Sequence, residues 1–451
     1  MAINSSKYKV LILRLLFYTI WTSVMLMWSP AKTFGQEKSG FQYADSLTYN
    51  LYLNSEWEAL TKAGNEALVQ GLDYYYLRMR IGIAFFNLEN YRIAAVHFEK
   101  ALEFNKGDNV ALDYLQKCLE WGGMEVEAAW LSKEYSTEVA GKVVSSVSLF
   151  YGHAFSGNEE ALEQLDIDGE ANIYGELIGT GNISYIHAGL NFSPANYLRW
   201  YAGYTNMQVS NHQRVVMDGV DTLENKYTLN QHHVVGRFPV RLAKGWNLVP
   251  AVDLINVNDR PVIVSYDNDL NAYNFADEEI TYTDYIVGLK IFRELPRWSL
   301  GAAISRSDLN EENQWQSSFI AGIYPAGNLN LYAFSTFSVF MENEETNFHF
   351  KQTIGGKVHS RLWLQGSTHF GHLKNAHDET SLVVFNSVGD IVSRSTASAI
   401  IFLSEKVILQ LDYSFIQNED SYLGFKDYES YRLQTYNYDN HHIMGGIKWK
   451  F

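Results

Sequence analysis

Residues 441–451 read HHIMGGIKWKF, and this stretch decides the fold class because apolar and polar side chains alternate along it. In an extended strand, successive side chains point to opposite faces. One face would carry Ile443, Gly445, Ile447, Trp449 and Phe451, and the other Met444, Gly446, Lys448 and Lys450. An apolar face toward lipid and a polar face toward a lumen are typical of a transmembrane β-strand.

The same alternation recurs upstream, in segments of about 10 to 14 residues whose connections are alternately short and long. Two further faces are Val407, Leu409, Leu411, Tyr413 and Phe415 against Gln410, Asp412 and Ser414, and Leu362, Leu364 and Phe370 against Gln365, Ser367 and His369. The short connections are expected at 194–196, 243–245, 293–297, 325–328, 359–360 and 404–405, and the long ones at 156–181, 210–226, 258–278, 371–390 and 417–437. This rhythm predicts an antiparallel transmembrane β-barrel of about 14 strands (range roughly 12–16) over residues 141–451, with its short turns in the periplasm.

The chain ends on an aromatic residue. The ending Trp449-Lys450-Phe451 is similar to the C-terminal signal of outer-membrane β-barrels. That resemblance implies recognition by the barrel assembly machinery and a final position among outer-membrane lipids. A soluble all-β sandwich would also alternate, but it does not need a regular order of short and long loops.

The N-terminus has the order of a secretory signal. Lys7, Lys9 and Arg14 precede an apolar run over 15–28 and a polar stretch with small residues. We therefore expect a signal peptide over residues 1–35, with a membrane anchor as the alternative. The one cysteine, Cys118, cannot form an intramolecular disulfide, so redox chemistry is not supported.

The composition is acidic and aromatic. A net charge of −16 without a basic cluster argues against a nucleic-acid partner. Aromatic residues make up 15% of the chain, including 30 tyrosines, and no apolar run after the N-terminal segment is long enough for a transmembrane helix. Strands that alternate within a membrane produce this profile.

Residues 75–109 read YYLRMRIGIAFFNLENYRIAAVHFEKALEFNKGDN. The spacing of six positions resembles the tetratricopeptide consensus: Gly82, Phe85, Tyr91, Ala94, Phe98 and Ala101. A shift by the 34-residue period of that family places Trp57 on Tyr91 in an earlier unit, and Ala128 on Ala94 in a later, degenerate unit. The small residues would let paired helices approach, and the aromatic residues would fill the space between them. The resemblance implies a short α-helical solenoid over 41–140, located in the periplasm and holding either a partner-binding groove or a helical hairpin without a binding role.

Two groups of residues could carry chemistry. In the loop that begins at Asp267-Asn268, oxygen atoms fall at positions 1, 3, 5 and 12 of a calcium-loop pattern: Asp267, Asp269, Asn271 and Glu278. Ala272 replaces the glycine of that pattern, so a solvated acidic loop is the favoured interpretation. A second group contains His369, His372, His377 and Asp378, without the helical spacing of zinc enzymes. No catalytic residue, cofactor or metal is predicted from either group.

Charged positions predicted to point inward are scattered in sign: Arg199, Arg237, Lys290, Asp412 and Lys448. They could line a water path or form ion-pair ladders in a plugged lumen, and the sequence leaves both open.

Periplasmic tetratricopeptide repeats before an outer-membrane barrel resemble the domain order of exopolysaccharide exporters and of YaiO-like barrel proteins. The first functional hypothesis is an adaptor or scaffold whose repeats bind a periplasmic protein. The alternative is a conduit for polysaccharide, another polymer or a solute. An outer-membrane enzyme is not favoured.

Overall fold

The structure is a computed structural model. It describes residues 40–135, 143–158, 174–195, 197–217, 220–267, 272–343, 345–378, 383–385, 389–425 and 431–451. The signal peptide expected over 1–35 and the calcium-loop positions 268–271 lie outside these ranges.

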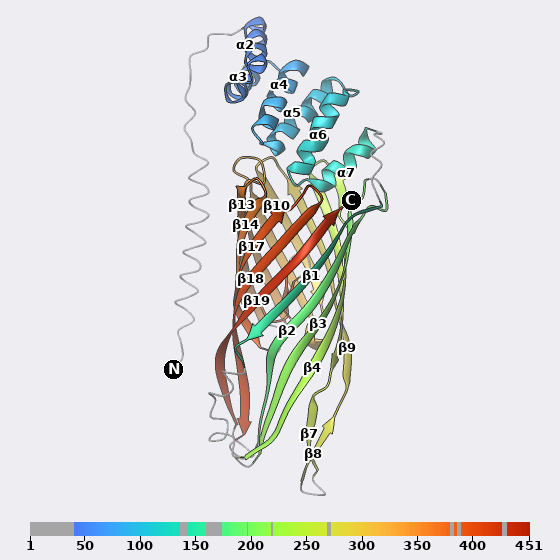
Figure 1. The fold of residues 1–451 in the computed structure, drawn as a ribbon, viewed down its shortest axis with the longest axis vertical. Helices are drawn as coiled ribbons and strands as arrows, with labels where there is room; N and C mark the ends of the chain where they lie inside the picture. The colour runs from blue at the N-terminus through green and yellow to red at the C-terminus, as the bar shows by residue number, and fades with distance from the viewer. Residues whose placement is uncertain are drawn as a thin grey trace.

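Six helices form the N-terminal part of the described chain. They are α2 (Phe41–Leu53), α3 (Trp57–Val69), α4 (Tyr75–Asn87), α5 (Tyr91–Phe104), α6 (Asn109–Trp121) and α7 (Glu125–Glu134). Alternate helices begin 34 residues apart, at Phe41, Tyr75 and Asn109, and again at Trp57, Tyr91 and Glu125. Figure 1 shows these helices stacked at one end of the strands. Among the described helices, none is long and apolar enough to cross a membrane.

Glycine allows close contact between neighbouring helices in this stack. A Cβ on Gly64 would lie 2.4 Å from Cγ1 of Ile81, and a Cβ on Gly82 would lie 2.9 Å from Cε1 of Phe98. Ile81 and Phe98 are fully buried, and the Phe98 ring stacks on Tyr114 with centroids 5.0 Å apart. Small residues on one helix thus receive large side chains from the next, which buries a continuous apolar core.

Strands make up most of the rest of the described chain. They are β1 (Val144–Ser156), β2 (Tyr174–Phe192), β3 (Trp200–Met217), β4 (Val220–Arg237), β5 (Val240–Ala243), β6 (Trp246–Asp259), β7 (Val262–Asp267), β8 (Ala272–Asp277), β9 (Ile280–Glu294), β10 (Trp298–Ser307), β11 (Gln314–Ile323), β12 (Leu331–Glu342), β13 (Glu345–His359), β14 (Leu362–Gly371), β15 (Ala376–His377), β16 (Val384–Phe385), β17 (Asp390–Phe402), β18 (Val407–Phe425) and β19 (Tyr431–Lys450). A single 3₁₀ turn, η1 (Leu309–Glu311), interrupts them.

The strands close into a barrel. All the neighbouring pairs of the main sheet are antiparallel, the last strand β19 pairs with β1, and β4 pairs with β6. Strand β5 continues β4 after Pro239, which has no N–H to donate to the ladder. With β4 and β5 counted as one, the closed barrel has 14 strands, as predicted. Closure satisfies the backbone hydrogen bonds of every wall strand, which lipid requires.

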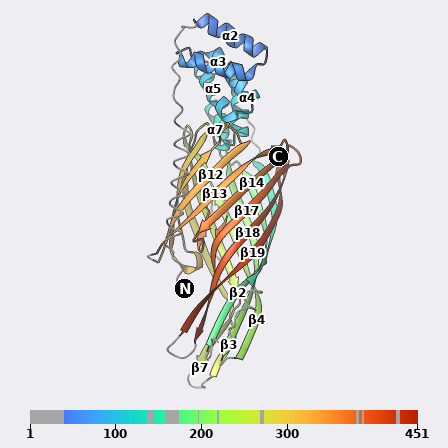
Figure 2. The same ribbon diagram turned by 90° about the vertical axis from the view of Figure 1, so that its left-hand side faces the viewer.

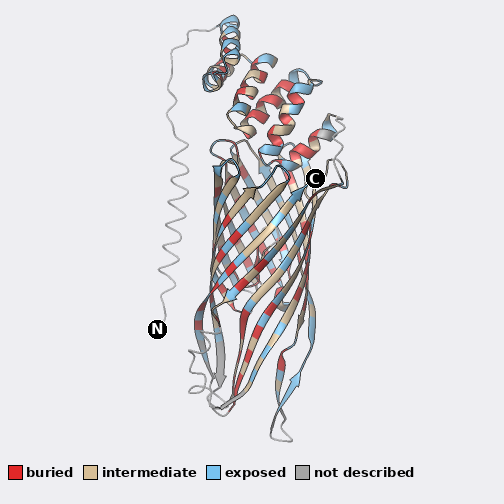
Figure 3. Ribbon diagram, viewed as in Figure 1, coloured by how far each residue is buried: buried red, intermediate tan, exposed pale blue. Residues whose placement is uncertain are grey.

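The predicted alternation is confirmed. On β18, Leu411 and Tyr413 are exposed on the outer face, whereas Asp412 and Ser414 are buried toward the lumen. Figure 3 shows this banding of buried and exposed residues along the barrel wall. The exposed aliphatic and aromatic side chains form an outer surface suited to lipid, so this is a barrel of the outer-membrane type.

The six short connections all lie where the sequence predicts them, at the end of the barrel that faces the helices. The predicted loops 210–226 and 417–437 are wrong, because strands β3, β4, β18 and β19 continue through most of them. Their far ends project beyond the rest of the barrel (Figure 2). Polar residues there still pair through the backbone, and outside lipid a strand needs no apolar face. The predicted loop 258–278 likewise contains the hairpin β7–β8.

Candidate functional site: the lumen below the helical domain

The helical domain is docked on the barrel through one buried arginine. Arg92 of α5 is 1% exposed and forms an ion pair with Glu294 at the end of β9. Its guanidinium also donates to the carbonyl oxygens of Leu295 and Gly122, each at 2.9 Å, and lies 3.9 Å from the centroid of the Tyr324 ring. One side chain thus joins two helices to two barrel turns.

The backbone near Arg92 completes this contact. The N–H of Arg92 donates to the carbonyl of Gly327 at 2.9 Å. Gly327 has a φ of +66°, and a Cβ there would lie 2.6 Å from Cγ1 of Ile93. The β11–β12 turn therefore needs glycine both for its left-handed backbone and for its close approach to α5.

A second contact holds helix α7 to the β5–β6 turn. Glu127 is 8% exposed, forms an ion pair with Arg241 in which Nε lies 2.9 Å from the carboxylate, and accepts a hydrogen bond from the N–H of Gly245 at 3.0 Å. Burial raises the pKa of Glu127, and the charge of Arg241 opposes that effect. Next to it, the Trp130 ring lies 5.5 Å from the Tyr197 ring, with the Lys133 ammonium 4.1 Å from the Trp130 centroid.

A third contact joins the α4–α5 turn to the barrel rim. The Glu89 carboxylate accepts from Nδ2 of Asn330 at 2.8 Å and from Nζ of Lys357 at 3.1 Å. These two donors hold the pKa of Glu89 below its usual value. The three contacts involve the β5–β6, β9–β10 and β11–β12 turns and the end of β13, so the helices are held to the barrel rim at several points (Figure 1).

Farther into the lumen, the described part of the connection between β14 and β17 folds inward. His377 Nε2 lies 2.8 Å from Oγ of Ser305, and Gln316 donates from Nε2 to the carbonyl of His377 at 2.8 Å. Asn375 is 2% exposed and donates to Glu342 at 3.1 Å. The long connection predicted at 371–390 is present, but its described part lies inside the barrel rather than outside it, because wall side chains offer its polar groups hydrogen-bond partners there.

Apolar contacts also hold this connection. Val384 of β16 packs against a buried cluster of Ile255, Val257, Ile286 and Leu309 from the barrel wall and η1. Leu373, Ala376 and Phe385 form a second buried cluster with Ile391. This packing resembles that of a protein core more than that of a solvated loop.

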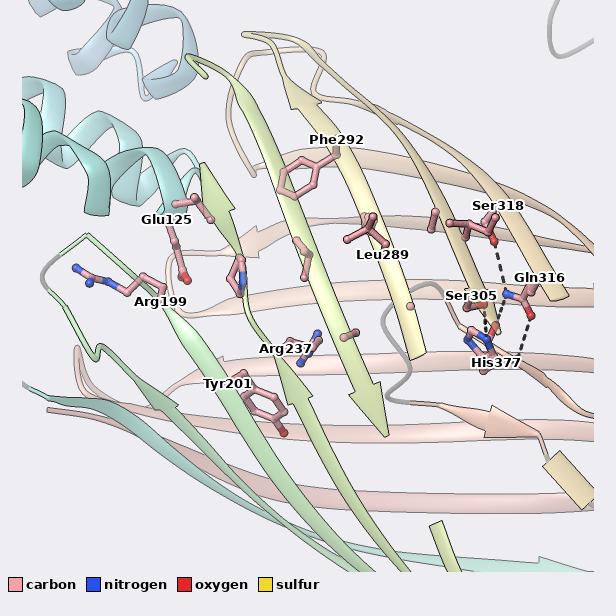
Figure 4. Close-up of a pocket in the computed structure, with 18 of the residues that line it drawn as sticks. Glu125, Arg199, Tyr201, Arg237, Leu289, Phe292, Ser305, Gln316, Ser318 and His377 are labelled. Carbon is pink, nitrogen blue, oxygen red and sulfur yellow. Dashed lines mark hydrogen bonds between the residues drawn. The ribbon is translucent and has the colours of Figure 1, made fainter. Parts of the chain in front are cut away.

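A cavity of about 250 Å³ remains in the lumen between helix α7 and the inward connection. Its charged lining residues are Arg199, Arg237, Lys290 and Glu125. Polar groups on the wall include Tyr201, Asn191, Ser305, Gln316, Ser318 and His377. Figure 4 shows Arg199 near Glu125 below the helices, Arg237 near Tyr201, and the Ser305, Gln316 and His377 group across the space. Three of the five inward positions predicted from alternation thus meet in one cavity, whereas Asp412 and Lys448 do not line it.

Aromatic rings position two of these cations. The Arg237 guanidinium lies 4.5 Å from the Tyr201 centroid, and the Lys290 ammonium lies 5.7 Å from the Phe292 centroid. The Tyr201 hydroxyl lies 2.6 Å from Nε2 of His187, which fixes the ring. Such cation–π contacts restrict the side chains.

The predicted histidine group is only partly brought together. His369 lies on the β14 wall, 5.6 Å from the Phe385 ring, and 6.3 Å from the ring of His349. His372 instead pairs with Asp390 at 3.2 Å. Among the described residues no group of three His, Cys, Asp or Glu side chains could hold a metal ion.

The predicted repeat positions lie in the helical core. Gly82, Ala94, Phe98 and Ala101 are buried, and the partly buried Phe85 and Tyr91 pack against the same cluster. Trp449 and Phe451 are half-exposed at the end of the last strand, with Trp449 paired to Val147 and Val407.

Sequence reasoning missed the docking residues. Arg92 and Glu294 are 202 positions apart in the sequence. The repeat spacing of helix α5 accounts for the neighbours of Arg92 but not for Arg92 itself. The one available signal is an arginine within the apolar run of a repeat, next to Tyr91 and Ile93.

Neither a protein-family model nor a curated protein sequence matches the chain. Among solved structures, it is similar to the Pseudomonas putida toluene transporter TodX, with 8% identity, a TM-score of 0.45 and coverage of 69% of this chain and 91% of that one. A Pseudomonas aeruginosa FadL homologue has 8% identity and a TM-score of 0.44, with coverage of 68% of this chain and 90% of that one. The Acinetobacter baumannii outer-membrane protein Omp33 has 8% identity and a TM-score of 0.31, with coverage of 69% of this chain and 100% of that one. At TM-scores this low, the likeness carries no argument about cargo.

Proposed function

We propose that this protein is an outer-membrane conduit for small solutes, with a periplasmic helical domain that restricts its mouth. The observation that carries this proposal is the cavity of about 250 Å³ inside the closed barrel, between helix α7 and the inward connection. Polar and charged side chains line it, as in barrels with a water-filled lumen. An adaptor function, the first of our sequence-based hypotheses, has no contact among the described residues in its favour.

A small solute suits this lumen better than a polymer. The helices cover the rim, and the connection carrying His377 occupies the lumen farther in. A polysaccharide chain would have to displace both, whereas a small molecule needs a local rearrangement at one of them. We therefore favour diffusion of a solute over export of a polymer.

The helices themselves are proposed to be three tetratricopeptide-like units. The 34-residue interval between alternate helix starts supports this assignment. Placement in the periplasm is supported by the short turns, which lie at the same end of the barrel as the helices.

Conductance of the full-length protein in planar lipid bilayers tests the proposal. Wild type is expected to give small, infrequent openings, and Arg92→Met should increase them because it releases α5 from the rim. A bifunctional thiol crosslinker between Glu99→Cys and Lys244→Cys, whose side chains form an ion pair at 3.1 Å, should reduce them. The buried Cys118 should not compete for the reagent.

Lys100→Met is the matched control, since Lys100 is exposed and pairs with the neighbouring Glu103 on the helix surface. If neither wild type nor Arg92→Met conducts after correct insertion, the protein is not a conduit.

A further inference from the structure

The lumen holds a serine and a histidine in hydrogen-bond contact. We propose that Ser305 and His377 are the nucleophile and the general base of a site that hydrolyses esters of short-chain carboxylic acids. The pair joins strand β10 of the wall to the inward connection, with Oγ of Ser305 2.8 Å from Nε2 of His377. Both residues line the cavity of about 250 Å³. This activity goes beyond the conduit function and does not depend on it.

A backbone carbonyl fixes the tautomer of His377. Nδ1 of the ring lies 2.7 Å from the carbonyl oxygen of Asp378, and a carbonyl oxygen can only accept a hydrogen bond. In the neutral imidazole, Nδ1 therefore carries the proton and Nε2 carries the lone pair. The Ser305 hydroxyl then donates to Nε2, which is the direction that a general base requires.

Gln316 holds the backbone of the histidine. Its Nε2 donates to the carbonyl of His377 at 2.8 Å, and its Oε1 accepts from the N–H of His377 at 3.3 Å. Gln316 is also the residue of β11 that pairs with Ser305 of β10. One antiparallel pair thus positions both the nucleophile and the base, and such orientation before substrate arrives contributes to the rate.

The same amide offers a donor for the charge that develops on the ester. The second N–H of Gln316 contacts Oγ of Ser318 at 3.5 Å, which is a long and weak hydrogen bond. A shorter bond to the oxyanion of the tetrahedral intermediate can replace it, so Gln316 would stabilise the transition state as well as position His377. Figure 4 shows Ser305, Gln316 and His377 together on one side of the cavity.

Small side chains leave room beside the nucleophile. Gly288 lies directly opposite Ser305 on β9, and Ala303, two residues before Ser305 on the same strand, lines the same cavity. The cavity volume of about 250 Å³ is that of roughly eight water molecules. A short-chain ester fits this space, whereas a phospholipid with two long acyl chains does not.

The reaction uses only the ester and water. Oγ of Ser305 attacks the carbonyl carbon and passes its proton to Nε2 of His377. The bond to the alcohol oxygen breaks, and that oxygen takes the proton from Nε2. A water molecule then attacks the acyl-serine, with its proton moving to Nε2 and on to Oγ as the carboxylic acid leaves. One ester and one water thus give one acid and one alcohol.

Hydrolysis of p-nitrophenyl acetate by the purified full chain in detergent tests the activity, with release of p-nitrophenolate as the readout. Ser305→Ala and His377→Asn should each lower kcat/KM at least about 100-fold, because a positioned general base alone contributes that much. Ser307→Ala is the matched control: Ser307 is the next buried serine on the inward face of β10, and its hydroxyl donates to Gln314 at 2.8 Å. His442→Asn, at a buried histidine that contacts Tyr185, controls for loss of an imidazole. Both controls should keep the wild-type rate.

Covalent labelling gives a second readout that a structural role would not produce. Phenylmethylsulfonyl fluoride should modify the wild-type protein at Ser305, as mapped by mass spectrometry, and His377→Asn should slow this reaction at least about 100-fold. Heat-modifiable electrophoretic mobility checks that each barrel is closed.

Equal hydrolysis by wild type and Ser305→Ala, or no hydrolysis and no label on Ser305 in the wild type, would overturn the assignment. Conductance without hydrolysis would support the conduit and reject the ester site. Hydrolysis that depends on Ser305 and His377 in a protein that never conducts would do the reverse.

Discussion

Arg92 on helix α5 and Glu294 at the end of strand β9 form a buried ion pair that joins the two parts of the chain across 202 residues. The Arg92 side chain is completely inaccessible and the Glu294 side chain is 12% exposed. Loss of one partner would therefore leave a buried charge without compensation.

Arg92→Met should release the helical domain from the rim. The expected cost is about 3–5 kcal/mol, as measured for broken buried pairs. Limited proteolysis should then cleave between the helices and the barrel, while the barrel keeps its heat-modifiable mobility. Lys100→Met breaks an exposed pair worth about 0–1 kcal/mol and should leave cleavage unchanged. Equal resistance of both variants would show that Arg92 does not carry the docking.

Phe98→Ala should unfold the helical domain without removing the barrel from the membrane. Phe98 is fully buried, and a large-to-small change in a core costs about 3–5 kcal/mol. Protease resistance before about residue 135 should be lost, while the membrane fraction is retained. Phe104→Ala, at a 52% exposed position on the same helix, is the control. A protease-resistant Phe98→Ala domain would contradict the repeat assignment.

The helical domain should lose stability in mild acid because of His97. Burial and the neighbouring Arg78 lower the pKa of His97 to about 4, although Asp73 opposes them. The unfolded chain binds this proton near pH 6.5 and the folded chain only near pH 4, so the free energy of unfolding falls as pH is lowered between these values. The fall is at most about 1.4 kcal/mol per pH unit. Denaturant unfolding at pH 7 and pH 5 should show it.

His97→Gln should reduce that difference between the two pH values. Carboxylates common to both proteins contribute equally, so an undiminished difference in the variant would assign the effect to other groups.

Epitope insertion tests the orientation. A tag after Asn343, in the exposed β12–β13 turn, should be labelled on intact cells. A tag after Glu405, in the exposed turn at the helical end, should be labelled only after the outer membrane is opened. The reverse pattern would place the helices outside the cell.

Removal of residues 445–451 should abolish barrel assembly. These residues pair with β1 on one side and with β18 on the other, so their loss leaves two unpaired edges in lipid. Lys450→Ala retains the backbone pairing and should assemble. Normal heat-modifiable mobility of the truncated chain would refute closure through β19.

Alternation predicted the barrel, the strand number and the short turns, because lipid outside and water inside impose a period of two. It failed at 417–437, where the outward side chains Gln417, Glu419, Thr435 and Asn437 are polar, so polarity no longer separates strand from loop. The inward positions Arg199, Arg237 and Lys290 followed from the same period. That these three residues line one cavity did not follow from this period, because it depends on the register between strands and on the position of helix α7.

The pairing of Ser146 with Lys450 also sets an order of events during biogenesis. The barrel cannot close until β19 lies beside β1, whereas the helices make local contacts and can fold earlier. During that interval the helical surface that later contacts the rim is exposed to water. An arginine is well solvated there, whereas an exposed leucine would promote aggregation. An arginine at position 92 therefore suits a helical domain that folds before the barrel turns to which it docks, because the domain has to stay soluble until then.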